Sequence, residues 1–279
     1  MSIKLMYITN NIEIAKIADH CGVDRIFIDL EKLGKEERQG HINSVKSHHA
    51  ISDIKAIRKV LNKAQVLVRV NPIHEFTERE INRVIEYGAD VVMLPYFKTS
   101  REVSQFLDIV NGRVKTCLLL ETKEAVEVLN DILRIDGIDE VHIGLNDLHL
   151  SYGKTFMFEL LADGTVESLC SAIKKFGIPF GFGGVAKLDS GIIPGKLILA
   201  EHVRLCSSMV ILSRSFFDST DVAELDFKSI EIDFRREIQS IRSYEQWLNL
   251  QDSDFFIRNM KDLKNIVQFE VDRRLAKQQ

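Results

Sequence analysis

Eight short runs of apolar or β-branched residues recur along the chain, and each is separated from the next by a segment with helical periodicity. Strands that alternate with amphipathic helices are typical of parallel α/β folds, and runs that are apolar almost throughout suit strands covered on both faces. Eight such units in about 220 residues favour a closed (β/α)8 TIM barrel over an open sheet. The predicted strands are Leu5–Thr9, Arg25–Leu30, Val66–Val70, Val91–Tyr96, Thr116–Glu121, Glu140–Asn146, Pro179–Val185 and Met209–Ser213.

The segments between these runs carry helix start and stop signals. Thr77 and Glu80 form a capping-box pattern, in which the hydroxyl and the carboxylate each satisfy a backbone N–H at the helix start. Gly88 and Gly137 follow apolar helical stripes and suit left-handed helix stops. Pro194 is expected to open the helix before the last strand.

The C-terminal part of the chain is predicted to form two long, charged helices with no strand between them. We therefore expect a barrel over residues 1–220 and a C-terminal helical extension over residues 221–279. The extension contains many apolar side chains, including Trp247, Phe255 and Phe256. Such a tail should pack on its own barrel or on a neighbouring subunit, and we expect a homo-oligomer.

Composition argues against several classes of function. A formal net charge of −4 without a long basic run does not favour nucleic acid binding. No apolar run reaches the roughly 18 residues of a membrane span, and the N-terminus lacks a signal-peptide pattern, so we expect a cytoplasmic protein. The four cysteines form no CxxC pair, which predicts buried free thiols rather than a zinc or redox site.

Two carboxylates stand at predicted strand ends, where barrels of this kind carry their chemistry. Glu121 ends the fifth strand, and Asp147 ends the sixth. Adjacent strands lie about 4.8 Å apart, so the two side chains could share one ion. Oxygen ligands with open positions suit Mg²⁺ or Mn²⁺ better than zinc. The alternative is that both residues are helix caps stabilised by the helix dipoles.

Other residues at the strand ends could bind anions. Arg69 ends the third strand and could hold a carboxylate with its planar fork, although a structural ion pair is the alternative. The glycines between Gly181 and Gly184 allow close approach of the backbone to an anion. Arg214 follows the eighth strand, where a rim salt bridge is expected.

Several short motifs follow one another in a specific order: Asp29-Leu-Glu31, Val68-Arg-Val-Asn-Pro72, Met93-Leu-Pro95, Leu120-Glu-Thr with Glu124-Ala-Val, and Ile143-Gly-Leu-Asn-Asp-Leu148 with Ser151 and Gly153. Their order and context resemble the HpcH/HpaI aldolase and citrate lyase β-subunit family of the phosphoenolpyruvate/pyruvate barrel superfamily. The resemblance covers about residues 4–216 and is thin beyond the last motif.

This resemblance implies metal-dependent cleavage or formation of a carbon–carbon bond next to a 2-oxo acid such as pyruvate. It makes Glu121 and Asp147 metal ligands, Arg69 the partner of the substrate carboxylate, and Glu31 a residue that holds metal-bound water. The segment Gly144-Leu145-Asn146 would contact the substrate. The resemblance also implies a trimer or hexamer.

The sequence departs from the family at two places. Many family aldolases have a histidine for proton transfer after the Asp-x-Glu motif, and citrate lyases have Glu-Asp-Ala-Val there; this chain has neither, because Lys32 follows Glu31. The usual proline before the second metal-ligand segment is replaced by Leu145. The metal-binding part is therefore expected to be retained, and the acid–base part altered.

Histidines in the loop after the second predicted strand could replace the missing base, since neutral histidine suits proton transfer near pH 7. We predict that His48 or His49, rather than His41, reaches the ligand; the alternative is a solvated polar loop.

Two other functions compete with the aldolase. One is a lyase or synthase acting on citryl- or malyl-coenzyme A thioesters, and the other is a barrel that binds a small acid without catalysis. A Schiff-base aldolase is disfavoured because the sixth predicted strand contains no lysine.

Overall fold

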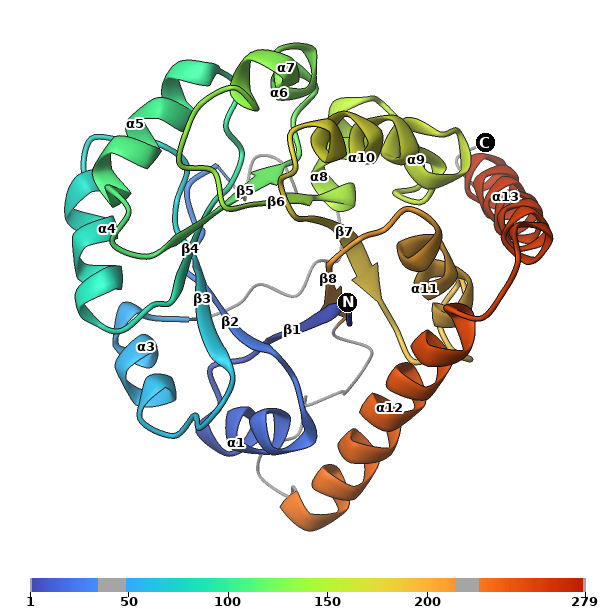
Figure 1. Ribbon diagram of the computed structural model, residues 1–279, viewed down its shortest axis with the longest axis horizontal. Helices are drawn as coiled ribbons and strands as arrows, with labels where there is room; N and C mark the ends of the chain where they lie inside the picture. Colours follow the sequence, from blue (N-terminus) through green and yellow to red (C-terminus); the bar gives the residue numbers. More distant parts are fainter. Residues whose placement is uncertain (1, 35–48, 214–225, 278–279) are drawn as a thin grey trace.

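The computed structural model describes residues 2–34, 49–213 and 226–277. Eight parallel strands form a closed barrel, in which each strand pairs with the next and β8 pairs with β1 (Figure 1). The predicted (β/α)8 fold is therefore confirmed. The strands are β1 (Lys4–Ile8), β2 (Arg25–Asp29), β3 (Gln65–Arg69), β4 (Val91–Leu94), β5 (Lys115–Leu120), β6 (Glu140–Ile143), β7 (Phe180–Val185) and β8 (Met209–Leu212).

Helices surround this ring of strands, as Figure 1 shows. Gly88 and Gly137 adopt the expected left-handed conformation, with φ of 102° and 97°. Pro194 immediately precedes α11 as its N-cap, as predicted. The helices are α1 (Ile12–Cys21), α3 (Ile51–Arg58), α4 (Thr77–Glu86), α5 (Ser100–Val110), α6 (Lys123–Glu127), α7 (Leu129–Ile132), α8 (Leu145–Ser151), α9 (Glu159–Ala162), α10 (Thr165–Lys175), α11 (Gly195–Arg204), α12 (Phe227–Leu248) and α13 (Ser253–Ala276).

The sixth strand is shorter than predicted. It ends at Ile143, and the chain then enters α8 through Gly144, whose N–H still bonds to a carbonyl of β5. Leu145, Leu148 and His149 are buried at spacings of three and four residues, which is the period of a helix and not of a strand. Asp147 therefore lies in the first turn of α8 and not at the end of a strand.

The predicted capping box at the start of α4 is wrong. Phe76 occupies the N-cap without a side-chain bond. The hydroxyl of Thr77 accepts a hydrogen bond from the N–H of His74 at 2.7 Å, and Glu80 accepts from the side chain of Asn71 at 2.8 Å. Both groups thus bind the loop before the helix instead of its first-turn N–H groups.

The apolar core has two parts. The larger part lies between the strands and the helices, and a smaller one fills the barrel with inward side chains such as Phe27, Met93 and Leu119. Three of the four cysteines are buried free thiols as predicted, but Cys206 is exposed, because it lies in the turn between α11 and β8.

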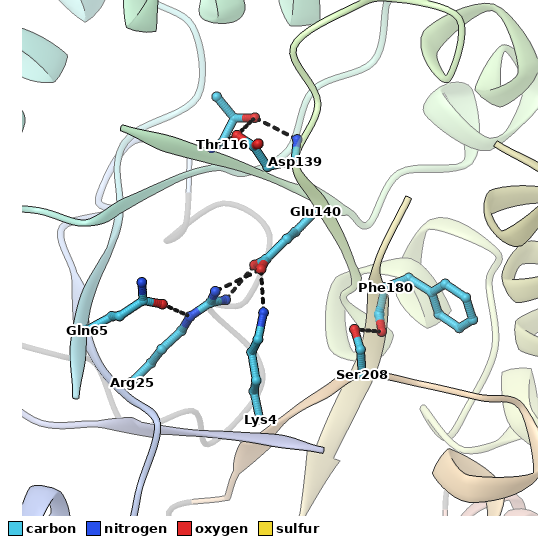
Figure 2. Close-up of polar contacts among 8 residues, drawn as sticks. All are labelled: Lys4, Arg25, Gln65, Thr116, Asp139, Glu140, Phe180 and Ser208. Atoms are coloured by element: carbon cyan, nitrogen blue, oxygen red, sulfur yellow. Dashed lines mark hydrogen bonds and ion pairs between the residues drawn. The ribbon is translucent and has the colours of Figure 1, made fainter. Parts of the chain in front are cut away.

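The amino ends of the strands are closed by a buried ionic network (Figure 2). Arg25 is fully buried, and its Nη2 donates to Oε1 of Glu140 across the barrel at 2.8 Å. Lys4 donates to the same carboxylate at 2.8 Å, and Gln65 accepts from Nε of Arg25 at 3.1 Å. Because every charge has a partner, this end of the barrel tolerates ions that would otherwise be costly to bury.

The C-terminal extension forms two helices, as predicted. In Figure 1, α12 runs past α1 and α11, and α13 lies beside α9 and α11. Phe234 packs edge-on against Tyr7 at 5.2 Å between ring centroids, so the tail shares the core of its own barrel. The boundary expected near residue 220 lies outside the described residues. None of the described helices is long and apolar enough to cross a membrane.

Candidate active site

A cavity of about 390 Å³ opens at the carboxyl ends of the strands. Its volume is in the range of small-molecule sites. Its walls come from at least six of the strands and the segments that follow them. The residues that line it are Phe27, Arg69, Leu119, Glu121, His142, Gly144, Leu145, Asn146, Asp147, Met157, Gly183, Gly184, Ile211 and Ser213. Six residues expected at the site are thus gathered around one cavity: Arg69, Glu121, Gly144, Leu145, Asn146 and Asp147.

Glu121 follows the last residue of β5 and is only 2% exposed. Its Oε1 accepts a hydrogen bond from the backbone N–H of Tyr96 at 3.0 Å. Tyr96 makes this bond from a left-handed conformation with φ of 50°, which is uncommon for a bulky residue. The adjacent helix α6 is capped by the hydroxyl of Thr122, so Glu121 does not serve as its cap.

Asp147 is 7% exposed and reaches the same cavity from the first turn of α8. The N-cap of this helix is Gly144, so Asp147 does not occupy the cap position either. Gly144 lies against Glu121, since a Cβ at this position would stand 2.7 Å from Oε2 of the carboxylate. The glycine therefore lets the two acidic segments approach each other.

Arg69 ends β3 and lines the cavity, but its planar fork is occupied. Nε and Nη2 each donate to Asp29 at 2.9 Å, and Nη2 lies 3.3 Å from Glu31. The ion pair that sequence reasoning left as an alternative is therefore present. Burial alone would lower the pKa of Arg69, but the carboxylates of Asp29, Glu31 and Glu121 outweigh burial and raise it above its ordinary value. The guanidinium thus stays charged.

Glu31 is buried beside Arg69, and a hydrogen-bonded network holds the segment after it. The side-chain oxygen of Asn71 accepts from the N–H groups of Lys32 and Leu33 at 2.8 and 3.0 Å. Asn71 in turn donates to Glu80 at 2.8 Å. Glu31 itself does not appear among the described residues that line the cavity.

His49 is buried, and its Nδ1 accepts the backbone N–H of Asp29 at 2.9 Å. Like Glu31, it is absent from the described lining of the cavity. It therefore holds the end of β2 in the described conformation. The other two candidate histidines, His41 and His48, lie outside the described residues, as does Arg214.

Sequence reasoning missed six of the residues that line the cavity: Phe27, Leu119, His142, Met157, Ile211 and Ser213. His142 lies in β6 two residues after Glu140 and therefore on the same face of the strand, so the period of two could have placed both side chains inside the barrel. Met157 lies in the segment between α8 and α9, where no sequence pattern predicts that a side chain faces the cavity. Of the glycine cluster in β7, Gly183 and Gly184 line the cavity.

The charges around the cavity suit a cation. Glu121 and Asp147 line the cavity, and Asp29 and Glu31 are buried behind it against Arg69. These four carboxylates and the guanidinium of Arg69 together give a formal charge of −3 (four negative, one positive). Among the described residues, no group of three or more His, Cys, Asp or Glu side chains has the arrangement of a metal site. Two carboxylates nevertheless fit Mg²⁺, which commonly binds through one or two carboxylates and keeps positions for water and substrate.

Comparison with known proteins identifies the family. The sequence profile of the HpcH/HpaI aldolase/citrate lyase family matches residues 4–179, which is more than half of the chain. The chain belongs to this family. Its enzyme class, aldolase or lyase, follows from that membership and agrees with the expectation from the motifs.

Individual relatives are distant. A hydroxypyruvate/pyruvate aldolase from Sagittula stellata is 21% identical over 218 residues, covering 65% of this chain and 76% of its own. A family member from Burkholderia cenocepacia has a similar structure, with a TM-score of 0.60, 15% identity, and coverage of 86% and 95% of the two chains. A citrate synthase gives a TM-score of 0.59 at 16% identity, with coverage of 83% and 95%. These structural similarities support the barrel fold.

Proposed function

We propose that this enzyme makes or breaks a carbon–carbon bond next to the 2-oxo group of a small acid such as pyruvate, with Mg²⁺ or Mn²⁺ held by Glu121 and Asp147. The observation that carries the proposal is the presence of these two buried carboxylates and the charged Arg69 around one cavity of ligand size. The name of the curated relative, a hydroxypyruvate/pyruvate aldolase, supports the choice of substrate class.

A divalent cation in this position would polarise the 2-oxo group and stabilise the negative charge that develops as the bond breaks. The residues of the chain supply the rest of the site. Arg69 adds a permanent positive charge to the cavity wall, although Asp29 already uses two of its donors. Gly144, Leu145 and Asn146 form the wall beside the two acidic residues and are proposed to contact the substrate.

We assign proton transfer to none of the described side chains that line the cavity. The Nδ1 lone pair of His49 is used by the N–H of Asp29, so His49 would need to release this bond before it could accept a proton. The prediction that His48 or His49 acts as the base stays a prediction, as does the role of Glu31 in holding metal-bound water. Alanine substitution of each histidine, read as a proton-exchange rate at saturating metal, tests it; unchanged rates in both variants would contradict it.

The most direct test of the proposed function is exchange of the pyruvate methyl protons with deuterium oxide, followed by NMR. This reports formation of the enolate without knowledge of the second substrate. We expect exchange that requires Mg²⁺ or Mn²⁺, stops with a chelator, and falls at least 100-fold in Asp147→Asn. Glu124→Gln is the matched control, because Glu124 is an exposed carboxylate in α6 that pairs with Lys98 in the loop before α5. Binding of pyruvate without any exchange would favour the barrel that binds an acid without catalysis.

A further inference from the structure

Ser151 belongs to the motif that begins at Ile143, and the proposed function leaves it without a role. It is the last residue of α8 and follows Asp147 by four residues, so both side chains lie on the same side of this helix. Its hydroxyl oxygen accepts a hydrogen bond from the backbone N–H of Lys123 at 2.8 Å. Lys123 is the first residue of α6 and stands two residues after Glu121. Ser151 therefore joins the helix that carries one proposed metal ligand to the segment that carries the other.

The same bond completes the start of α6. The first N–H groups of a helix have no partner within the helix. Thr122, the N-cap, accepts the N–H of Ala125 at 3.2 Å, and its own hydroxyl donates to the carbonyl of Phe97 at 2.7 Å. The N–H of Lys123 takes its acceptor from outside the helix, and Ser151 supplies it. The start of α6 thus depends on a side chain of α8 as well as on its own N-cap.

A second bond joins the other end of α8 to the same segment. The N–H of Gly144, the N-cap of α8, donates to the carbonyl of Leu120 at 3.0 Å. Leu120 immediately precedes Glu121. The two bonds therefore flank Glu121 on one segment and Asp147 on the other. One bond alone would let α8 pivot, whereas two bonds fix its orientation relative to the segment that carries Glu121.

The separation of two carboxylates influences which ion they can share. Mg²⁺ needs oxygen ligands at about 2.0–2.1 Å in a near-octahedral arrangement, whereas Ca²⁺ takes them at about 2.3–2.6 Å in more flexible arrangements. We propose that Ser151 is a positioning residue that fixes the distance between Glu121 and Asp147 and so raises the affinity of the site for Mg²⁺ relative to Ca²⁺. It acts through the backbone of Lys123 and is not a metal ligand itself. This inference rests on the proposed function, because it assumes that the two carboxylates hold the metal.

The test measures the affinities for Mg²⁺ and Ca²⁺ separately, by calorimetric titration of the wild type and of two variants. In Ser151→Ala the affinity for Mg²⁺ should fall about 10-fold, the effect of losing a residue that orients a metal ligand. The affinity for Ca²⁺ should fall less than about 3-fold, because Ca²⁺ tolerates a looser arrangement of ligands. Ser151→Thr keeps the hydroxyl, so the ratio of the two affinities should return to the wild-type value.

Asn11→Ala is the matched control. The side chain of Asn11 caps α1 by accepting the N–H groups of Glu13 and Ile14, on the opposite side of the barrel from α6 (Figure 1). This variant should lower the midpoint of urea unfolding as Ser151→Ala does and leave both metal affinities unchanged. A Ser151→Ala protein that is destabilised but keeps the wild-type ratio of affinities would overturn the inference and leave the proposed function standing. A wild type that binds neither ion would overturn both.

Ser151→Asn tests the same spacing with the hydrogen bond retained. The side-chain oxygen of asparagine stands one atom farther from the backbone than that of serine, so α8 should lie farther from the segment that carries Glu121. We expect this variant to be more stable than Ser151→Ala in urea unfolding, and its relative affinity should shift toward Ca²⁺. An unchanged ratio of affinities in Ser151→Asn would overturn the inference even if Ser151→Ala fails to fold.

Discussion

Gly144 lies directly against the side chain of Glu121. A Cβ at residue 144 would stand 2.7 Å from Oε2 and 3.0 Å from Cβ of that glutamate. The φ of Gly144 is −84°, which any residue can adopt, so the constraint is space and not backbone conformation. Gly144 therefore fixes how closely the start of α8 approaches the carboxylate of Glu121, which follows β5.

Gly144→Ala is predicted to displace Glu121, because overpacking a tight site forces side chains to move at a cost of about 1–3 kcal/mol. We expect Mn²⁺ affinity to fall about 10-fold or more, measured by calorimetry. The control is Gly112→Ala, where φ is +64° but no atom lies within 4 Å of the added Cβ. This variant should lose about 1 kcal/mol of stability from backbone strain and keep its metal affinity. Unchanged metal binding in Gly144→Ala would contradict the prediction.

Removal of either proposed ligand should abolish metal binding and preserve the fold. Glu121→Ala and Asp147→Ala each remove one negative charge from a cavity whose described lining contains two carboxylates and one guanidinium. We expect each variant to bind Mn²⁺ at least 100-fold more weakly in calorimetric titrations, with a circular dichroism spectrum like that of the wild type. Equal affinity in the wild type and both variants would refute the assignment of the site.

The ion pair at the opposite end of the barrel predicts a pH-dependent stability. Burial by itself would raise the pKa of Glu140, but hydrogen bonds and charges from Arg25 and Lys4 outweigh it and lower the pKa. A carboxylate with a lowered pKa in the folded state stabilises the fold above its unfolded pKa of about 4.3 and loses that contribution as pH falls through the folded value.

Glu140→Gln leaves Arg25 buried without its anionic partner, and the variant should lose about 3–5 kcal/mol at pH 7 in urea unfolding. The difference from the wild type should shrink progressively below about pH 4, as Glu140 takes up a proton in the wild type. Asp131→Asn, which breaks an exposed pair with Arg134, should change stability little at either pH. A difference that stays constant down to pH 3 would be inconsistent with this account.

The sequence predicts the barrel well because strand and helix periods are local signals. All eight strands lie within a few residues of their predicted positions, and the largest error, at the end of β6, comes from Gly144 turning the chain into a helix. Polar partners were harder to predict. The pairing of Asp29 with Arg69 and the contact of Glu80 with Asn71 depend on which side chains the closed barrel brings together. Spacing along the chain carries no information on such distances.

The oligomeric state of the protein is a prediction that rests on the exposed apolar residues of the C-terminal helices. Several large apolar side chains on or beside α12 and α13 are exposed: Ile232, Leu250, Ile257 and Phe269 are 67%, 82%, 57% and 71% exposed. We expect these residues to be covered in a homo-oligomer, a trimer or hexamer by resemblance to the family. Light scattering at micromolar concentration measures this directly, and Phe269→Asp should shift the protein toward smaller species. A monomeric wild type would contradict the prediction.

The last helix reaches the segment that carries one wall of the cavity. The guanidinium of Arg274 in α13 lies 4.3 Å from the ring centroid of Phe156, and its Nη1 donates to the carbonyl of Thr155 at 3.4 Å. The next residue along the chain, Met157, lines the cavity. The C-terminal extension therefore helps to hold the segment between α8 and α9 in place.

Arg274→Ala is predicted to loosen this segment and to weaken the binding of pyruvate several-fold, with a loss of stability of about 1 kcal/mol from the cation–π contact. Arg274→Lys keeps the charge but not the planar group, so it should recover only part of the affinity. Arg273→Ala is the matched control, because within the described part of the chain Arg273 pairs with Glu270 and makes no hydrogen bond to the segment between α8 and α9. Pyruvate titrations of the three variants at saturating Mg²⁺ separate these effects. Equal losses in Arg273→Ala and Arg274→Ala would mean that the pairing with Glu270, rather than the contact with Phe156, supports the cavity wall.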